Sequence, residues 1–225
     1  MAGQLSAFGE LEGIEGVFIA DSNDLRCSAL KLKDDRLCLF SPVTGLGEKA
    51  LESLAGIGEV AFLLAPNHYH NKALRAYADA FPDAELCASD KAAPRLRKVT
   101  GLDIASLKNL RALLPPGVDF IEPVGLKTGE VWLRMRKHKE TSWLVVDAFC
   151  GPKIQARRKE AAKPEILKPF PTYGTGDKAA YAAWVCQQIR EDEPKRIIPC
   201  HGAVLRAQDL PAKLESLVQE VFVGS

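Results

Sequence analysis

The stretch VAFLLAPNHYHNKA, residues 60–73, decides the fold that the sequence predicts. Its opening run, VAFLLA, is apolar without interruption, which is typical of a strand buried on both faces of a parallel sheet. The run gives way to Pro66 and then to His68 and His70. Polar residues that follow such a strand lie at the rim of the sheet, where loops converge and sites form. We therefore expect a central parallel strand with a candidate site at its carboxyl end.

The sequence on either side of this stretch alternates between strand and helix patterns. Short apolar runs separated by turn signals predict strands, and apolar residues at helical spacing predict helices. Before residue 117 we expect strands at 16–20, 27–33, 36–43, 60–65 and 84–89 and helices at 47–58, 71–81 and 90–101. After it we expect strands at 118–124, 130–137, 141–149 and 196–200 and helices at 178–192 and 210–222. A β-rich part followed by an α/β part thus occurs twice, which suits an α/β fold with four layers.

Composition excludes several classes of protein. The 225 residues are 47% hydrophobic, enough to fill the core of one compact domain. Thirty Lys plus Arg against twenty-nine Asp plus Glu give a formal net charge of +1, so no global field favours nucleic acid or an acidic membrane surface. The six cysteines form no C-x-x-C pair, and no signal peptide or membrane-spanning run is evident. We expect a cytoplasmic protein with reduced thiols and a small-molecule substrate or ligand.

Two further polar residues follow apolar strands in the same way. Asp147 follows the run WLVV, and His201 follows the run RIIPC. Within an extended segment, His68 and His70 would point to one side, because side chains alternate along a strand. Neutral imidazole suits zinc, iron or manganese, although each of these signals alone is also typical of ordinary loop residues. Together they predict a metal site.

The arrangement resembles the metallo-β-lactamase superfamily over nearly the whole chain. In that family a strand leads into H-x-H-x-D-H, a later strand ends in an aspartate that bridges two metals, and a last strand ends in a histidine followed by glycine. Here the matching segments are NHYHNKA at 67–73, LVVDAF at 144–149 and IIPCHG at 197–202. The resemblance implies a single domain over residues 1–225, a four-layer αββα sandwich, and metal ligation by His68, His70, Asp147 and His201.

The chain departs from the family pattern at the second metal. Lys72 stands where the family has aspartate, and Ala73 where it has the next histidine. The segment that carries the middle histidine, 123–133, offers Leu126, Lys127 and Thr128 instead. We therefore expect at most one divalent transition metal: zinc, iron or manganese. A lysine that pointed inward would oppose a cation, or would occupy the vacant position and pair with Asp147. In that case Lys72→Asp would tighten metal binding.

His138 could replace the missing histidine only if it reached the site. It lies at the turn between the strands expected at 130–137 and 141–149, on the order of 20 Å from Asp147 along the strand. We expect that it is not a ligand.

Two functions remain open on the sequence. In the first, the protein is a metal-dependent hydrolase, with Asp147 as a ligand or as general base. In the second, it is a catalytically degenerate member that acts as a ligand-binding or scaffold protein, an interpretation favoured by Lys72 and Ala73.

Overall fold

The computed structural model describes residues 3–137, 140–154 and 160–224. It divides into two compact units, Met1–Pro116 and Gly117–Ser225. This boundary coincides with the point at which the sequence pattern begins its second β-rich part. The two units are described separately, and a single domain spanning residues 1–225 stays a prediction.

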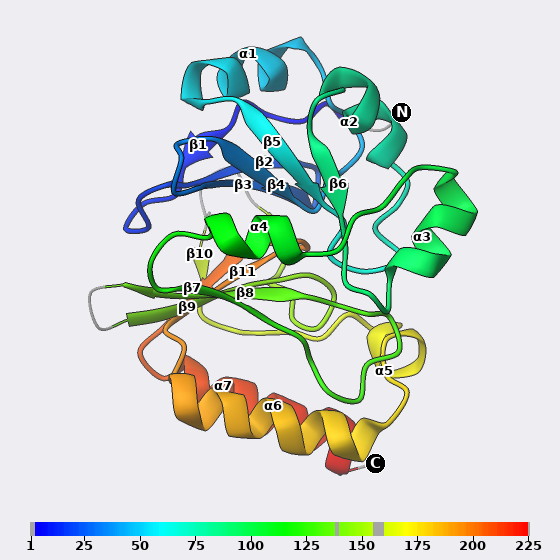
Figure 1. Cartoon of the computed structure of the whole chain (residues 1–225). Helices are drawn as coiled ribbons and strands as arrows, with labels where there is room; N and C mark the ends of the chain where they lie inside the picture. Colours follow the sequence, from blue (N-terminus) through cyan, green and yellow to red (C-terminus); the bar gives the residue numbers. More distant parts are fainter. Residues whose placement is uncertain (1–2, 138–139, 155–159, 225) are drawn as a thin grey trace. The chain divides into compact units, whose positions relative to one another are not determined.

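The first unit contains a six-stranded sheet in the order β1-β2-β3-β4-β5-β6 (Figure 1). Its strands are β1 (Gly9–Glu10), β2 (Val17–Ser22), β3 (Leu25–Lys31), β4 (Leu37–Phe40), β5 (Val60–Leu64) and β6 (Glu85–Cys87). The first four strands pair antiparallel, whereas β4, β5 and β6 run parallel. Every residue of β4 and β5 is buried, as expected for central parallel strands covered on both faces. The apolar run at 60–65 therefore forms the strand that the sequence predicts.

The helices of the first unit follow its parallel strands. They are α1 (Glu48–Ile57), α2 (Leu74–Ala80), α3 (Ala93–Thr100) and α4 (Lys108–Leu113). Helix α3 ends at Gly101, whose backbone adopts the left-handed conformation that glycine tolerates best. The sequence predicts the first three helices, but α2 and α3 each begin three residues later than expected. Helix α4 was not predicted, because it has only six residues and ends one residue before the turn at Pro115 and Pro116.

The second unit contains another six-stranded sheet, in the order β10-β12-β11-β9-β8-β7. Its strands are β7 (Val118–Ile121), β8 (Trp132–Lys137), β9 (Glu140–Val145), β10 (Glu160–Ala161), β11 (Arg196–Pro199) and β12 (Val204–Arg206). The antiparallel pair β8 and β9 confirms the predicted hairpin, and β9 pairs in parallel with β11. The short strands β10 and β12 were not predicted, because two or three residues carry no readable alternation.

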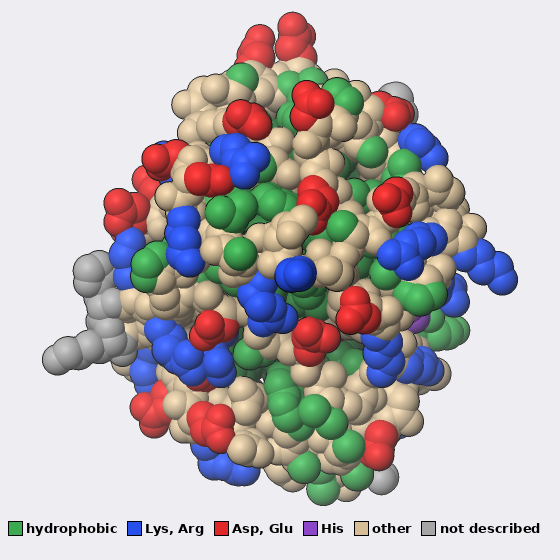
Figure 2. Space-filling view, viewed as in Figure 1, with side chains coloured by type: hydrophobic (Ala, Val, Ile, Leu, Met, Phe, Trp, Pro, Cys, Tyr) green, Lys and Arg blue, Asp and Glu red, His purple; other side chains and the backbone are tan. Residues whose placement is uncertain are grey.

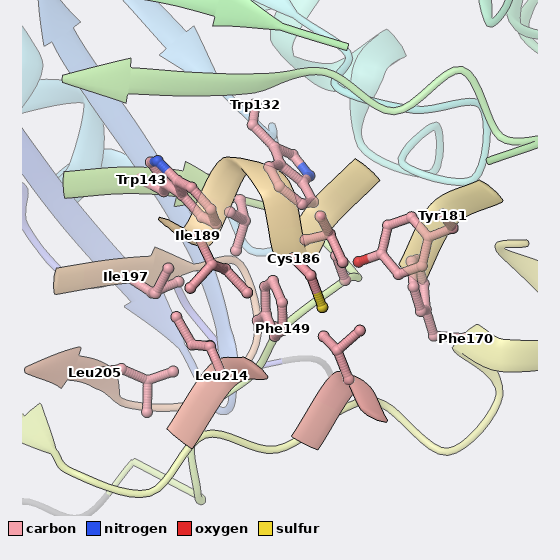
Figure 3. Packing of buried hydrophobic residues seen from close by; sticks show 14 of the residues in the cluster. Trp132, Trp143, Phe149, Phe170, Tyr181, Cys186, Ile189, Ile197, Leu205 and Leu214 are labelled. Carbon is pink, nitrogen blue, oxygen red and sulfur yellow. The ribbon is translucent and has the colours of Figure 1, made fainter. Parts of the chain in front are cut away.

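Helices α5 (Phe170–Tyr173), α6 (Lys178–Asp192) and α7 (Leu210–Val218) belong to the second unit, and a π-helical turn (Gln219–Val223) continues α7. Helix α6 begins at Asp177, whose carboxylate accepts a hydrogen bond from the backbone N–H of Ala180. Helices α6 and α7 lie side by side in Figure 1. Their apolar faces meet strand residues in a core that includes Trp132, Trp143 and Phe149 (Figure 3). This core fixes the strands that carry Asp147 and His201.

Basic and acidic side chains are interspersed over the molecular face drawn in Figure 2, in keeping with the net charge of +1. Among the described residues, no helix is both long enough and apolar enough to cross a membrane.

Candidate functional site

The first cluster consists of Ser41, Asn67, His68 and His70, all in the first unit. Ser41 directly follows β4, and the histidines follow β5 after a short loop. Because β4 and β5 are parallel neighbours, their carboxyl ends lie at the same edge of the sheet. The sheet therefore brings together residues 41 and 70, which are 29 positions apart in the chain.

The loop that carries the two histidines is a hydrogen-bonded turn. The Oδ1 atom of the buried Asn67 accepts hydrogen bonds from the backbone N–H groups of Tyr69 and His70, at 2.8 and 3.1 Å. The Asn71 side chain donates from Nδ2 to the carbonyl of His68 at 2.9 Å. The sequence argument placed His68 and His70 in an extended segment, and this is wrong: β5 ends at Leu64, and residues 68–70 form a turn. The side-chain amides determine where the imidazoles lie, because strand alternation has ended.

His68 is a buried imidazole with one unpartnered nitrogen. Its side chain is mostly shielded, with 9% of the residue exposed, and its Nε2 atom has no hydrogen-bond partner among the described residues. Burial, together with the positive charges of Arg95 and Lys91, holds the pKa of His68 below its ordinary value. The neutral imidazole is thereby favoured, and this is the form that binds a metal ion.

His70 is oriented by a hydroxyl group. Its Nδ1 atom lies 2.8 Å from Oγ of Ser41, a residue that is fully buried. The backbone of Ser41 has a φ of 59°, in the left-handed region that few residues other than glycine adopt. If Nδ1 donates its hydrogen to Ser41, the unprotonated ring nitrogen of His70 is Nε2. Sequence reasoning did not single out Ser41, since one serine after a strand carries no signal of its own.

The two positions that replace the family's second-metal ligands have different surroundings. Lys72 is exposed, and Ala73 is buried beside the start of α2. An exposed ammonium group is solvated by water and cannot occupy a buried metal position. The suggestion that an inward-pointing Lys72 fills the vacant position is therefore wrong.

The second cluster consists of Asp147, Cys200 and His201, all in the second unit. Asp147 follows β9 and His201 follows β11, and these parallel strands align Val145 with Pro199. Both residues therefore emerge at the same edge of the sheet, as the sequence predicts. The Oδ1 atom of Asp147 lies 3.0 Å from Nε2 of His201. An imidazole bonded to a carboxylate in this way can accept a proton from a nucleophile or ligate an ion.

The loops that carry Asp147 and His201 are held together by backbone contacts. The N–H of Gly151 donates to the carbonyl of His201 at 3.1 Å, and the N–H of Ala203 donates to the carbonyl of Pro152 at 2.9 Å. A Cβ atom on Gly151 would lie 2.1 Å from the carbonyl oxygen of Ala203, and one on Gly202 would lie 2.1 Å from that of Gly151. Only glycine at both positions permits this approach.

Cys200 is the residue that sequence reasoning missed in this cluster. Its Sγ atom lies within 4.8 Å of a ring nitrogen of His201, and the residue is buried. The sequence predicted only that the six cysteines are reduced thiols, and it singled out none of them as a ligand. The signal that could have found Cys200 is its position, directly before His201 at the end of β11.

The segment expected to carry a middle histidine has no histidine, and the residues at that place are Leu126, Lys127 and Thr128. Leu126 is buried, and the exposed Lys127 donates from Nζ to the carbonyl of Thr172 at 2.8 Å. Lys127 is thus engaged with α5 and does not pair with Asp147. The hydroxyl of Thr128 is buried without a partner among the described residues. His138 lies outside the described residues, so its expected remoteness stays a prediction.

No family model matches the sequence, and a search of curated proteins found no match. Among solved structures, the metallo-β-lactamase from Pontibacter korlensis matches with a TM-score of 0.60 and 13% identity, over 96% of this chain and 99% of that one. The metallo-β-lactamase FIM-1 from Pseudomonas aeruginosa, solved in its mono-zinc form, matches with a TM-score of 0.58 and 10% identity, over 99% and 98%.

A flavodiiron protein shares the same fold. The metal-soaked flavodiiron core of Flv1 from Synechocystis sp. PCC6803 matches with a TM-score of 0.61 and 12% identity, over 98% of this chain. The chain spans only 62% of the length of that structure, so the two proteins share a fold over part of Flv1. Identities of this size establish the fold alone. The mixed α/β chain, with one six-stranded sheet in each unit, therefore has the metallo-β-lactamase fold, as its sequence predicts.

Proposed function

We propose that the protein is a metal-dependent hydrolase that holds at most one divalent transition metal. The proposed ligands are His68 and His70 of the first unit and Asp147 and His201 of the second. Zinc, iron and manganese all suit a set of imidazole and carboxylate donors. The observation that carries the proposal is the unpartnered Nε2 of the buried His68.

An unsatisfied ring nitrogen is costly in a folded protein. Leaving a buried polar atom without a partner costs about 1–3 kcal/mol, so native structures seldom retain one without a ligand, ion or water. At His68 the lowered pKa favours the neutral imidazole, the form in which one ring nitrogen can donate its lone pair to a metal ion. His70 meets a second requirement of metal sites, since its other ring nitrogen is fixed by Ser41. The first cluster therefore fits a metal ion.

The second cluster fits a metal ion by its spacing. Two ligands that each lie about 2.0–2.1 Å from one ion are separated by roughly 3 Å. The Asp147 Oδ1 and His201 Nε2 atoms are 3.0 Å apart. The same spacing also suits a direct hydrogen bond, so this cluster supports the proposal only in combination with the first.

The limit of one metal rests on the residues that replace the second set of ligands. Lys72, Ala73 and Leu126 contribute no donor atom to a buried site. The FIM-1 structure, solved in its mono-zinc form, supports the proposal that the fold accommodates a single ion.

The proposed chemistry is the hydrolysis of an ester, thioester or phosphoester. A bound ion would lower the pKa of a coordinated water and polarise the oxygen under attack. Asp147 is the residue that would orient this water or accept its proton, unless its carboxylate serves only as a ligand. Ser41 and Asn67 would hold the imidazoles in place. We also propose a small-molecule substrate and a cytoplasmic location.

Metal stoichiometry tests this proposal. Metal-free protein should take up about one zinc or manganese per chain in elemental analysis and in a calorimetric titration. His68→Ala should abolish that uptake, whereas His138→Ala should leave it unaltered, because His138 is expected at a distant turn. Two tightly bound ions per chain would contradict the proposed site, and equal losses in both variants would contradict the assignment of ligands.

The second candidate function is ligand binding without catalysis. It is favoured by the hydrogen bond between His201 and Asp147, which gives this imidazole a partner without an ion. In this case the titration would show no metal uptake, and the clusters would serve a pocket for a small ligand.

A further inference from the structure

We infer that Tyr69, Lys91 and Arg95 form a subsite for an anionic group of the substrate, a carboxylate or a phosphate, directly beside His68. The inference rests on the proposed function, because it names the class of ester that the site would accept. All of its residues belong to the first unit.

Tyr69 connects the candidate ligand to a cation. Its ring contacts the ring of His68 edge to face, with 4.4 Å between the two centroids. The guanidinium carbon of Arg95, on α3, lies 5.2 Å from the centroid of the same ring. Tyr69 is 40% exposed, which is unusual for a large aromatic side chain. The ring therefore presents an accessible surface between the imidazole and the guanidinium.

Arg95 is oriented but not neutralised. Among the described residues, no carboxylate forms an ion pair with it, and its side chain is exposed. A cation–π contact holds a guanidinium in place while its N–H donors stay directed outward. Five donors in a planar fork match the two oxygens of a carboxylate or a phosphate. This is the chemistry of a recognition residue.

Lys91 adds a second positive charge at the same place. Both Lys91 and Arg95 act electrostatically on the His68 imidazole, so both charges lie near it. Asp90 is the exposed acidic neighbour in the chain, and Lys72 is a third exposed cation in the loop of the histidines. The two positive charges that act on His68 favour an anion next to the candidate ligand.

The unpartnered Nε2 of His68, proposed above to bind the metal, lies beside this subsite. Neither Tyr69 nor Arg95 satisfies it in the described residues. A substrate whose anionic group is bound by Arg95 would bring its ester group toward His68, as positioning for catalysis requires. Neutral esters would lack this anchor.

Anion binding tests the inference without depending on hydrolysis. Benzoate and phenyl phosphate serve as anionic probes and benzyl alcohol as the neutral control, each titrated into metal-free and zinc-loaded protein by calorimetry. We expect both anions to bind metal-free protein and benzyl alcohol to bind far more weakly. Arg95→Gln should weaken anion binding by on the order of tenfold, and Arg95→Lys by less. The matched control is Lys98→Gln, an exposed cation near the end of the same helix, which should change nothing.

Equal anion affinity in the parent and in Arg95→Gln, or an equal loss in Lys98→Gln, would overturn the subsite. The ratio of the two anion affinities shows whether carboxylate or phosphate is preferred. Failure of the hydrolase proposal has a different signature, because metal uptake would be absent while the Arg95-dependent anion binding remained.

Discussion

The two clusters occupy equivalent positions on their sheets, but their histidines have different hydrogen-bond partners. In each unit a pair of adjacent parallel strands, β4 and β5 or β9 and β11, delivers polar residues to one edge. In the second cluster the imidazole of His201 is bonded to a carboxylate. In the first cluster Nδ1 of His70 contacts the hydroxyl of Ser41, and Nε2 of His68 meets no hydrogen-bond partner in the described residues. The same strand arrangement thus produces a paired histidine in one unit and an unsatisfied one in the other.

This contrast indicates how the two clusters contribute to the stability of the fold in the absence of a metal ion. A histidine that is already hydrogen-bonded contributes to the fold, whereas an unsatisfied buried one costs stability until a ligand binds it. The second cluster is therefore expected to support the metal-free fold, and the first to gain most from metal. The predictions that follow test this division.

The largest loss of zinc affinity is expected when a histidine is removed from either cluster. His68→Leu and His201→Leu should each weaken zinc binding more than 100-fold, since one ligand of four contributes roughly 3 kcal/mol. Calorimetric titration measures this loss.

The stability of the metal-free variants should differ between the clusters. His201→Leu should lower the free energy of unfolding by about 1 kcal/mol, because Asp147 loses a hydrogen bond. His68→Leu should leave it unchanged or raise it, because an unsatisfied nitrogen is removed. Urea denaturation measures the free energy of unfolding of both variants. Equal destabilisation would contradict the proposed difference between the two clusters.

A smaller effect is expected at Ser41. Removing its hydroxyl takes away the group that orients His70, and losses of this kind typically cost about 10–100-fold in metal affinity. Ser41→Ala and Ser41→Gly should both show the loss in a zinc titration. The glycine variant should be the more stable of the two by about 1 kcal/mol, since it relieves the left-handed backbone. Unaltered zinc affinity in both variants would show that Ser41 does not orient the ligand.

A still smaller effect is expected at Lys72. Because its side chain is exposed, Lys72→Asp should change zinc affinity by less than about threefold, as water and salt screen the charge. On the sequence, tighter metal binding was expected only if Lys72 pointed inward. A gain of tenfold or more in titration would place the side chain of residue 72 close to the metal.

The smallest effect concerns pH. The pKa of His68 is lowered by burial and by the nearby cations, so the unfolded chain binds this proton more readily than the folded one. Between the lowered pKa and the ordinary value of about 6.5, the metal-free protein should lose stability as pH falls. Urea denaturation across this range should show a flatter pH dependence for His68→Leu than for the parent. Identical slopes would contradict the burial assigned to His68.

The sequence predicted the fold well because its strongest signals are long apolar strands. The run at 60–65 and the runs before Asp147 and His201 are read correctly, since buried parallel strands need continuous hydrophobic residues. The location of the candidate ligands at strand ends follows directly from these runs.

The finer details of the clusters could not be read in this way. The turn at residues 68–70 depends on the side-chain amides of Asn67 and Asn71, and Ser41 reaches His70 only through the pairing of β4 with β5. Cys200 was overlooked because a buried cysteine is usually a small hydrophobic residue. Contacts between residues distant in the chain leave no periodic trace in the sequence.

Gly151 and Gly202 limit which amino-acid substitutions the protein can tolerate. A Cβ atom at either position would collide with a backbone carbonyl oxygen. The loops of Asp147 and His201 can therefore approach each other this closely only because both residues are glycine. In a mutational library these two positions should tolerate almost no substitution, even though neither glycine offers a functional group. New substrate preferences would then arise from side-chain substitutions, while the backbone that holds Asp147 and His201 stays constant.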